Sequence, residues 1–245
     1  GFSVVKGTDG EKDKIRFGLT TIKNFGEGIT NTIVEERKNP PAGGGHFKSL
    51  EDFLTRIKDR NLNKKSLEAL IKSGALDLFG ERGILLFNLE RILEYHKESA
   101  VESNHDSLFG SLSSVNSLSL VPAEEISIKE RLTWEKELLG LYISGHPLDA
   151  FKEKINSQKN SIKKIKEEGK NGETVVVGGM LEEVKPYLTK KGENMFFTKI
   201  SDMSDTIEMV VFPSVLKESP NIFEPDQCIA VKAKISLRNG EKSLI

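Results

Sequence analysis

Hydrophobic and polar positions in the first hundred residues follow the period of an α-helix, interrupted by short breaks. Ile29, Ile33 and Val34 fall on one face of a helix. The stretch 39–45 ends that helix, because its two prolines and three glycines cannot continue one. Three further helical patterns follow. Their apolar stripes are Leu50, Phe53, Leu54 and Ile57; Leu67, Leu70 and Ile71; and Leu85, Leu89, Ile92 and Leu93.

From Glu173 onward the period changes to two, which is typical of β-strands. The clearest strand pattern is 227–236, and three more strand candidates are 174–184, 194–201 and 206–212. With a short helix predicted at 213–219, these elements suit a small five-stranded barrel of the oligonucleotide/oligosaccharide-binding (OB) type. Asn239-Gly240 predicts a hairpin turn, after which the fifth strand has barely begun. We therefore expect a C-terminally truncated barrel.

Between these two regions lies a stretch rich in serine and asparagine, which is typical of a linker. A further helix is predicted over 126–144 and is expected to end because of Pro147. The predicted fold class is thus a multidomain α + β chain. Its predicted parts are the end of an upstream domain (1–13), an all-α region (14–100), a polar linker (101–125), connecting helices (126–171) and the OB-fold barrel (172–245).

Composition excludes several classes of function. Lys and Arg number 36 against 37 Asp and Glu, so overall charge neither favours nor excludes nucleic acid. The single cysteine, Cys228, cannot form a disulfide within the chain, and with four histidines it cannot supply a standard zinc site. No apolar run is long enough to span a membrane, so we expect a cytoplasmic protein without a metal or cofactor in this segment. Both ends look like cuts in a longer protein.

Gly26 and Gly28 stand one residue apart, directly before the helical pattern that starts at Ile29. Amide groups at a helix start have no intrahelical acceptor, and glycines there would let a phosphate approach them closely. A helix–helix turn that simply needs positive φ explains the glycines equally well. A dinucleotide-binding loop is rejected, because Asn31 stands where the third glycine is needed.

The stretch Phe25 to Ile29 has the pattern of a helix-hairpin-helix: apolar residue, glycine, any residue, glycine, apolar residue. Such a motif holds duplex nucleic acid by its backbone. The stretch 73–83 is a second, weaker candidate copy, and the preceding stretch 56–65 carries five basic residues and one acidic residue. If both stretches are copies, residues 14–100 form a tandem helix-hairpin-helix region. Its candidate DNA-binding residues are Lys23, Asn24, Gly26, Gly28, Thr30, Lys64, Lys65 and Gly74.

The stretches IRFGLTTIKNFGEGITNTIVEER, FKSLEDFLTRI, LNKKSLEALIKSGALDLFG and ERLTWEKELLGLYISGHPLDAF occur in this order. From about Lys14 to its end, the chain thereby resembles the C-terminal part of the bacterial DNA polymerase III alpha subunit. The resemblance implies that the helical region holds duplex DNA behind the active site, and that the barrel lies near single-stranded template. The parent family is a DNA-directed DNA polymerase, a nucleotidyltransferase expected to use Mg, whose catalytic carboxylates would lie upstream. Other polymerase III holoenzyme subunits are implied partners, and no catalytic residue is assigned here.

The resemblance also implies a sliding-clamp peptide in the polar linker. In this family a Gln-x-Ser/Asp-Leu-Phe peptide docks into the clamp, and Ser107, Leu108 and Phe109 match that pattern. His105 departs from it, because glutamine is usual there. Two adjacent large apolar residues in a polar linker favour a pocket on a partner, although packing on the chain's own helices is the alternative. The candidate clamp-binding residues are His105, Asp106, Ser107, Leu108 and Phe109.

Single-strand binding by the barrel needs exposed aromatic side chains beside basic ones. The candidates are Tyr187, Lys190, Lys191, Phe196 and Phe197. Consecutive strand residues face opposite sides, so one of the two phenylalanines is expected in the core. Residues 173–245 carry 9 basic and 11 acidic residues, which is unfavourable for strong binding.

Together these patterns indicate a non-catalytic segment that holds DNA and tethers the polymerase to its clamp. The alternative is a structural scaffold that binds other replisome proteins with little direct DNA contact, and the negative charge of the barrel favours it. A repair nuclease is disfavoured, because no constellation of carboxylates or histidines is present.

Overall fold

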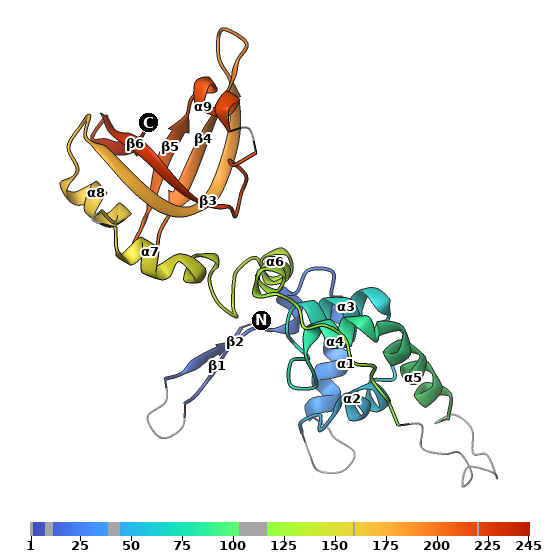
Figure 1. Ribbon diagram of the computed structural model, residues 1–245. Helices are drawn as coiled ribbons and strands as arrows, with labels where there is room; N and C mark the ends of the chain where they lie inside the picture. Colours follow the sequence, from blue (N-terminus) through green and yellow to red (C-terminus); the bar gives the residue numbers. More distant parts are fainter. Residues whose placement is uncertain (1, 8–11, 39–44, 103–116, 159, 220) are drawn as a thin grey trace. The chain divides into compact units, whose positions relative to one another are not determined.

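The computed structural model describes residues 2–7, 12–38, 45–102, 117–158, 160–219 and 221–245 (Figure 1). The chain divides into two compact units, Gly1–Ser144 and Gly145–Ile245. No helix among the described residues has the length and apolar character needed to cross a membrane.

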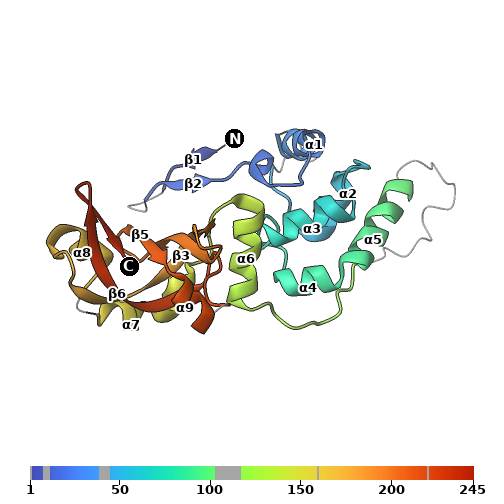
Figure 2. The ribbon, with the colours of Figure 1, turned by 90° about the horizontal axis from the view of Figure 1, so that it is seen from above.

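The first unit is helical apart from one small hairpin. Its elements are β1 (Ser3–Val5), β2 (Lys14–Arg16), the 3-10 helix η1 (Leu19–Thr21), α1 (Glu27–Lys38), α2 (Leu50–Arg56), α3 (Lys64–Lys72), α4 (Arg82–Phe87), α5 (Leu89–Glu102) and α6 (Ile128–Leu139). Strands β1 and β2 pair antiparallel. Helix α3 is central to this unit, in contact with α4, α5 and α6 (Figure 2).

The apolar stripes meet in one core, as the period predicts. Ile29, Phe53, Leu67 and Ile92 are among its fully enclosed members, and Leu93 packs against them from a partly buried position. Burial of such side chains stabilises each helix by roughly 1.5–3 kcal/mol per residue relative to exposure. The all-α prediction for 14–100 is thereby confirmed except for β2, whose three residues pair with β1.

The predicted helix over 126–144 is shorter than expected. Helix α6 begins with a capping box between Ser127 and Glu130 and ends at Leu139, where Gly140 takes a left-handed conformation with φ of 79°. The helix therefore ends at this glycine. Pro147 is the first residue of the next element rather than the cause of that ending, because proline suits the first position of a helix.

The second unit contains the sheet. Its elements are the 3-10 helix η2 (Pro147–Phe151), α7 (Lys152–Asn156), α8 (Ile162–Glu168), β3 (Thr174–Leu188), β4 (Asn194–Ser201), β5 (Thr206–Val211), α9 (Pro213–Glu218), β6 (Cys228–Arg238) and β7 (Glu241–Leu244). The five strands form a closed barrel in the order β3-β4-β5-β7-β6. This order confirms the OB-type prediction.

The short fifth strand decides how the barrel closes. Strand β7 has only four residues, yet it pairs antiparallel with β6 and parallel with β5. The fifth strand is thus short, as expected, but its four residues already take their place in the order of strands. Leu244 on β7 is fully buried in the barrel core, which anchors the strand.

Candidate nucleic-acid interface

The glycine turn of the first unit differs in detail from the expectation. Helix α1 begins at Glu27, so Gly26 precedes the helix and Gly28 is its second residue. The first helical hydrogen bond runs from the Thr30 amide to the Gly26 carbonyl over 3.2 Å. The amides before Thr30 have no acceptor within the helix, and Gly26 and Gly28 are exposed.

Backbone conformation does not explain these glycines. The residue with positive φ in this turn is Asn24, at 65°, and neither Gly26 nor Gly28 adopts such an angle. The interpretation that they serve a positive-φ turn is therefore wrong. Packing does not explain them either, because a Cβ atom built on Gly26 or Gly28 would meet nothing within 4 Å. The space beside both residues is open to a ligand.

A hollow of about 280 Å³ lies at this turn, and we call it the turn hollow. It is lined by Asn24, Gly26, Gly28, Ile29, Asn61, Asn63, Lys65 and Ser66. The start of α3 thus faces the same space as the start of α1. Asn63 caps α3, since its side chain accepts from the Ser66 amide over 3.1 Å. Two positive helix ends therefore converge on one hollow.

The basic candidates take different positions around this hollow. Lys65 lines the turn hollow and is exposed. Lys64 is also exposed, but its amine lies 3.3 Å from the Glu90 carboxylate. Lys23 is exposed, while its backbone amide donates to the Leu138 carbonyl over 2.9 Å and fixes the turn to α6.

Other charges near this surface reduce its positive character. Glu27 stands exposed between the two glycines and offsets part of the positive end of α1. Arg56 belongs to the basic run, yet it is bound internally to Glu36 and Asp52 and lies over the Phe47 ring. The full charge of the run is therefore not available to a ligand.

Two of the predicted DNA contacts are structural residues. The Thr30 side chain is buried, and its hydroxyl donates to the Gly26 carbonyl over 3.0 Å. Gly74 ends α3 with φ of 80°, and a Cβ atom there would collide with the Arg82 guanidinium. The Thr30 side chain is thus not placed to reach DNA, and Gly74 serves the left-handed end of α3, so both assignments are corrected.

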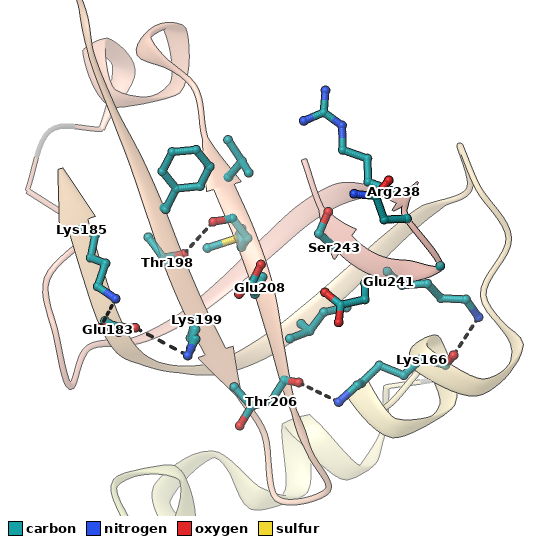
Figure 3. A pocket seen from close by; sticks show the side chains of 17 residues that line it. Lys166, Glu183, Lys185, Thr198, Lys199, Thr206, Glu208, Arg238, Glu241 and Ser243 are labelled. Atoms are coloured by element: carbon teal, nitrogen blue, oxygen red, sulfur yellow. Dashed lines mark hydrogen bonds and ion pairs between the residues drawn. The ribbon is translucent and has the colours of Figure 1, made fainter. Parts of the chain in front are cut away.

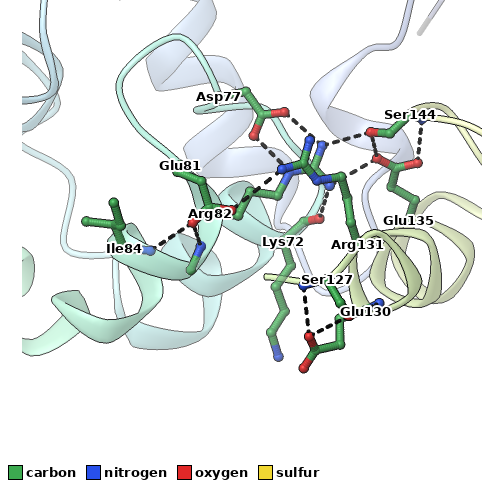
Figure 4. Close-up of polar contacts among 11 residues, drawn as sticks. Lys72, Asp77, Glu81, Arg82, Ile84, Ser127, Glu130, Arg131, Glu135 and Ser144 are labelled. Carbon is green, nitrogen blue, oxygen red and sulfur yellow. Dashed lines mark hydrogen bonds and ion pairs between the residues drawn. The ribbon is translucent and has the colours of Figure 1, made fainter. Parts of the chain in front are cut away.

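The second candidate copy, 73–83, is closed by an internal ion network (Figure 4). Arg82 donates to both Asp77 oxygens over 2.8 Å and to Glu135 over 3.0 Å. Glu135 also accepts from the Ile143 and Ser144 amides over 2.7 and 2.8 Å, and from the Ser144 hydroxyl. The Arg82 guanidinium thus occupies the space beside Gly74.

Hydrogen bonds control the ionisation of Glu135. Burial raises the pKa of this carboxyl, but the hydrogen bonds from Ser144, Ile143 and Arg82 outweigh it and leave the pKa below the ordinary value. Glu135 is therefore ionised at neutral pH, opposite a buried arginine. This network connects the loop after α6 to the start of α4.

The barrel carries a second candidate surface, a groove of about 770 Å³ over β4, β5 and the β6–β7 turn (Figure 3). We call it the barrel groove. Its charged residues are the basic Lys166, Lys185, Lys199, Arg238 and Lys242 and the acidic Glu183, Glu208 and Glu241. Basic residues thus outnumber acidic ones here, although acidic residues predominate over 173–245. This face and this turn are where OB folds bind oligonucleotides.

Strand register arranges the aromatic candidates. Phe197 lines the barrel groove, 46% exposed, and its ring meets that of Tyr187 edge to face at 5.7 Å between centroids. Phe196 points the other way and packs against the barrel core, as strand alternation predicts. Lys190 and Lys191 are exposed in the β3–β4 turn and do not line the groove.

Sequence reasoning missed Phe212, which is 45% exposed just after β5. Val210 pairs with Phe197, so Phe212, two residues later, continues onto the same face of the sheet. Strand register thus decides which face of the sheet this residue extends. The alternation in TIEMVVF was the available signal.

The clamp-binding candidates, residues 105–109, lie outside the described residues. Among the residues that the structure does describe, no three His, Cys, Asp or Glu side chains are grouped to hold a metal ion.

Two family models match the chain. The model described as a helix-hairpin-helix motif matches residues 1–83. The model described as an OB-fold nucleic acid binding domain matches residues 175–245. Both matches agree with the two units seen in the structure.

Curated relatives match across both units. The DNA polymerase III subunit alpha of Aquifex aeolicus is 37% identical over 221 residues, which are 90% of this chain and 17% of that protein. That of Bacillus subtilis is 33% identical over 243 residues, 96% of this chain and 21% of that protein. The chain thus spans about a fifth of these relatives. A solved structure of RecG bound to a three-way DNA junction aligns with 80% of this chain and with 30% of the RecG chain. The two are 12% identical, with a TM-score of 0.25.

Proposed function

The chain corresponds to the helix-hairpin-helix and OB-fold region of bacterial DNA polymerase III alpha subunits, and on that premise we propose that it holds DNA without catalysing a reaction. The turn hollow binds the phosphates of duplex DNA, and the barrel groove contacts single-stranded template. The catalytic carboxylates and the Mg ions that they use belong to other parts of the parent polymerase.

The observation that carries the duplex proposal is the open space at Gly26 and Gly28. Neither positive φ nor internal packing requires glycine at these positions. Glycine is a poorer helix former than alanine, so Gly28 weakens the first turn of α1, and no contact within the protein compensates for this. The glycines are explained if an anion must approach the unpaired backbone amides closely. Lys65 on α3 and the N-cap residue Asn63 then contact the same DNA backbone from the other side of the hollow.

Duplex affinity measured by fluorescence anisotropy tests this proposal. Replacing Gly26 or Gly28 with Val places methyl groups in the path of the phosphate, and we expect affinity to fall at least tenfold. Affinity that stays unchanged in both variants would remove the phosphate site. It would favour the scaffold alternative, in which the chain binds replisome proteins and barely touches DNA.

We also propose that the linker tethers the polymerase to a sliding clamp. This proposal rests on the sequence of residues 105–109, where Leu108 and Phe109 would anchor an extended peptide. A short peptide of this kind typically binds with micromolar affinity, about −8 kcal/mol. Calorimetric titration of the clamp with the native linker peptide and with its Leu108→Ala/Phe109→Ala version tests it. Equal affinities would contradict the tether.

A further inference from the structure

One carboxylate in the barrel groove holds two of its lysines (Figure 3). The Glu183 side chain on β3 lies 2.7 Å from the Lys185 amine and 3.7 Å from the Lys199 amine. Strand register causes this arrangement, because Glu183 pairs with Lys199 on β4 while Lys185 projects from the same face two residues along β3. The hydrogen bond from Lys185 holds the pKa of Glu183 below its ordinary value, so this carboxylate is charged at neutral pH.

Most of the other positive charge in the groove is also occupied. Lys166 lies 2.9 Å from the Asp205 carboxylate. Lys242 donates to carbonyl oxygens in the last turn of α8, the shortest over 2.7 Å. Only the Arg238 guanidinium has no hydrogen-bond or ion-pair partner among the residues that the structure describes. The free protein therefore presents less positive charge to a ligand than its five basic residues suggest.

We propose that Glu183 acts as a built-in competitor for phosphate, which keeps Lys185 and Lys199 occupied until a single strand displaces it. This inference rests on the proposed single-strand function of the barrel groove. Displacement is feasible because the Lys185, Glu183 and Lys199 side chains are 66%, 39% and 46% exposed, and exposed ion pairs are weak. Each phosphate that enters replaces the Glu183 carboxylate as the partner of a lysine, so the net gain in binding free energy is small. A contact of this kind lets a strand slide instead of holding it in place.

Glu208 provides a matched control for this idea. It lines the same groove and pairs across the sheet with Lys199, in the same row of side chains as Glu183. Within the described part of the chain, however, it makes no ion pair. Glu183→Gln and Glu208→Gln remove the same charge from the same surface, and only the first releases two lysines.

The test is fluorescence anisotropy with a fluorescein-labelled oligothymidylate and the whole chain at moderate salt. We expect Glu183→Gln to bind roughly twofold to fivefold more tightly than the native chain, because an exposed ion pair is worth at most about 1 kcal/mol. Glu208→Gln should gain less than twofold. In a Lys185→Met/Lys199→Met background, the gain from Glu183→Gln should fall to that of Glu208→Gln, because no lysine remains to be released.

Two other outcomes would overturn the inference. If the Glu183→Gln chain binds the oligonucleotide no more tightly than the Glu208→Gln chain, only the general charge of the groove matters. Weaker binding would show that Glu183 positions the lysines for the strand. Phe197→Ala separates this failure from failure of the proposed function. If Phe197→Ala leaves affinity unchanged, or no variant binds the oligonucleotide, the groove is not the single-strand site.

Discussion

The Gly28→Ala substitution distinguishes the effect of this glycine on the stability of α1 from its effect on DNA binding. Gly28 is the second residue of the twelve-residue helix α1, its φ is not positive, and a Cβ atom there meets nothing within 4 Å. Alanine therefore introduces no strain and removes the entropic cost of glycine. Because Gly28 lies in the first turn, we expect the free energy of unfolding of the first unit to rise by less than the roughly 0.5–1 kcal/mol of a helix interior.

The same methyl group should weaken DNA binding. It projects beside the open amides of the turn hollow and keeps a phosphate oxygen from hydrogen-bond distance. Loss of one hydrogen bond to a charged group is worth about 1.5–3 kcal/mol, which corresponds to a roughly tenfold to hundredfold loss of duplex affinity. Stability and binding should thus change in opposite directions.

Urea denaturation followed by circular dichroism measures the stability, and anisotropy with a labelled duplex measures the affinity. Gly140→Ala is the control, because Gly140 also has open space around it but adopts φ of 79°. That variant should lose about 1–2 kcal/mol of stability through left-handed strain and keep its DNA affinity. A more stable Gly28→Ala chain with unchanged duplex affinity would refute the phosphate-binding role of this glycine. A less stable chain would refute the reasoning about its helix.

Two further predictions concern the polar network of the first unit and the barrel. Glu135→Ala leaves Arg82 without its buried partner and should cost about 3–5 kcal/mol in urea denaturation. Because the folded pKa of Glu135 lies below the ordinary value of 4.5, its stabilisation is complete above that pH and is lost as pH falls through the lower folded pKa. The native chain should therefore lose stability below about pH 4.5 more steeply than Glu135→Ala, and equal slopes in acid would contradict this role. Lys242 on β7 places its cation at the last turn of α8, and Lys242→Met removes it. We expect barrel stability to fall by about 0.5–1 kcal/mol, measured from the thermal midpoint of the second unit. An unchanged midpoint would mean that Lys242 is only solvated.

The sequence by itself determined most of the elements and the faces that they bury, although not every boundary: α6 ends at Leu139, and the last predicted stripe is divided between α4 and α5. Helical stripes and strand alternation depend on residues a few positions apart, and the side chains of one stripe must share a face whatever the rest of the chain does. The core of the first unit and the five-stranded barrel were predictable for this reason. The separation of Phe196 from Phe197 was predictable as well, because neighbouring strand residues point to opposite sides.

Only the tertiary structure decided which of these elements form a site. The stretch 73–83, which marked Gly74 as a second phosphate turn, contains Arg82 but gives no sign of Glu135, which lies 53 residues further along the chain and binds Arg82 in the folded structure. Likewise, nothing local to Asn63 and Lys65 places them across a hollow from Gly26. Strand register decided that Glu183 occupies the two lysines of the barrel groove. Neighbours of this kind are chosen by the packing of whole helices and the pairing of whole strands, so short stretches of sequence cannot specify them.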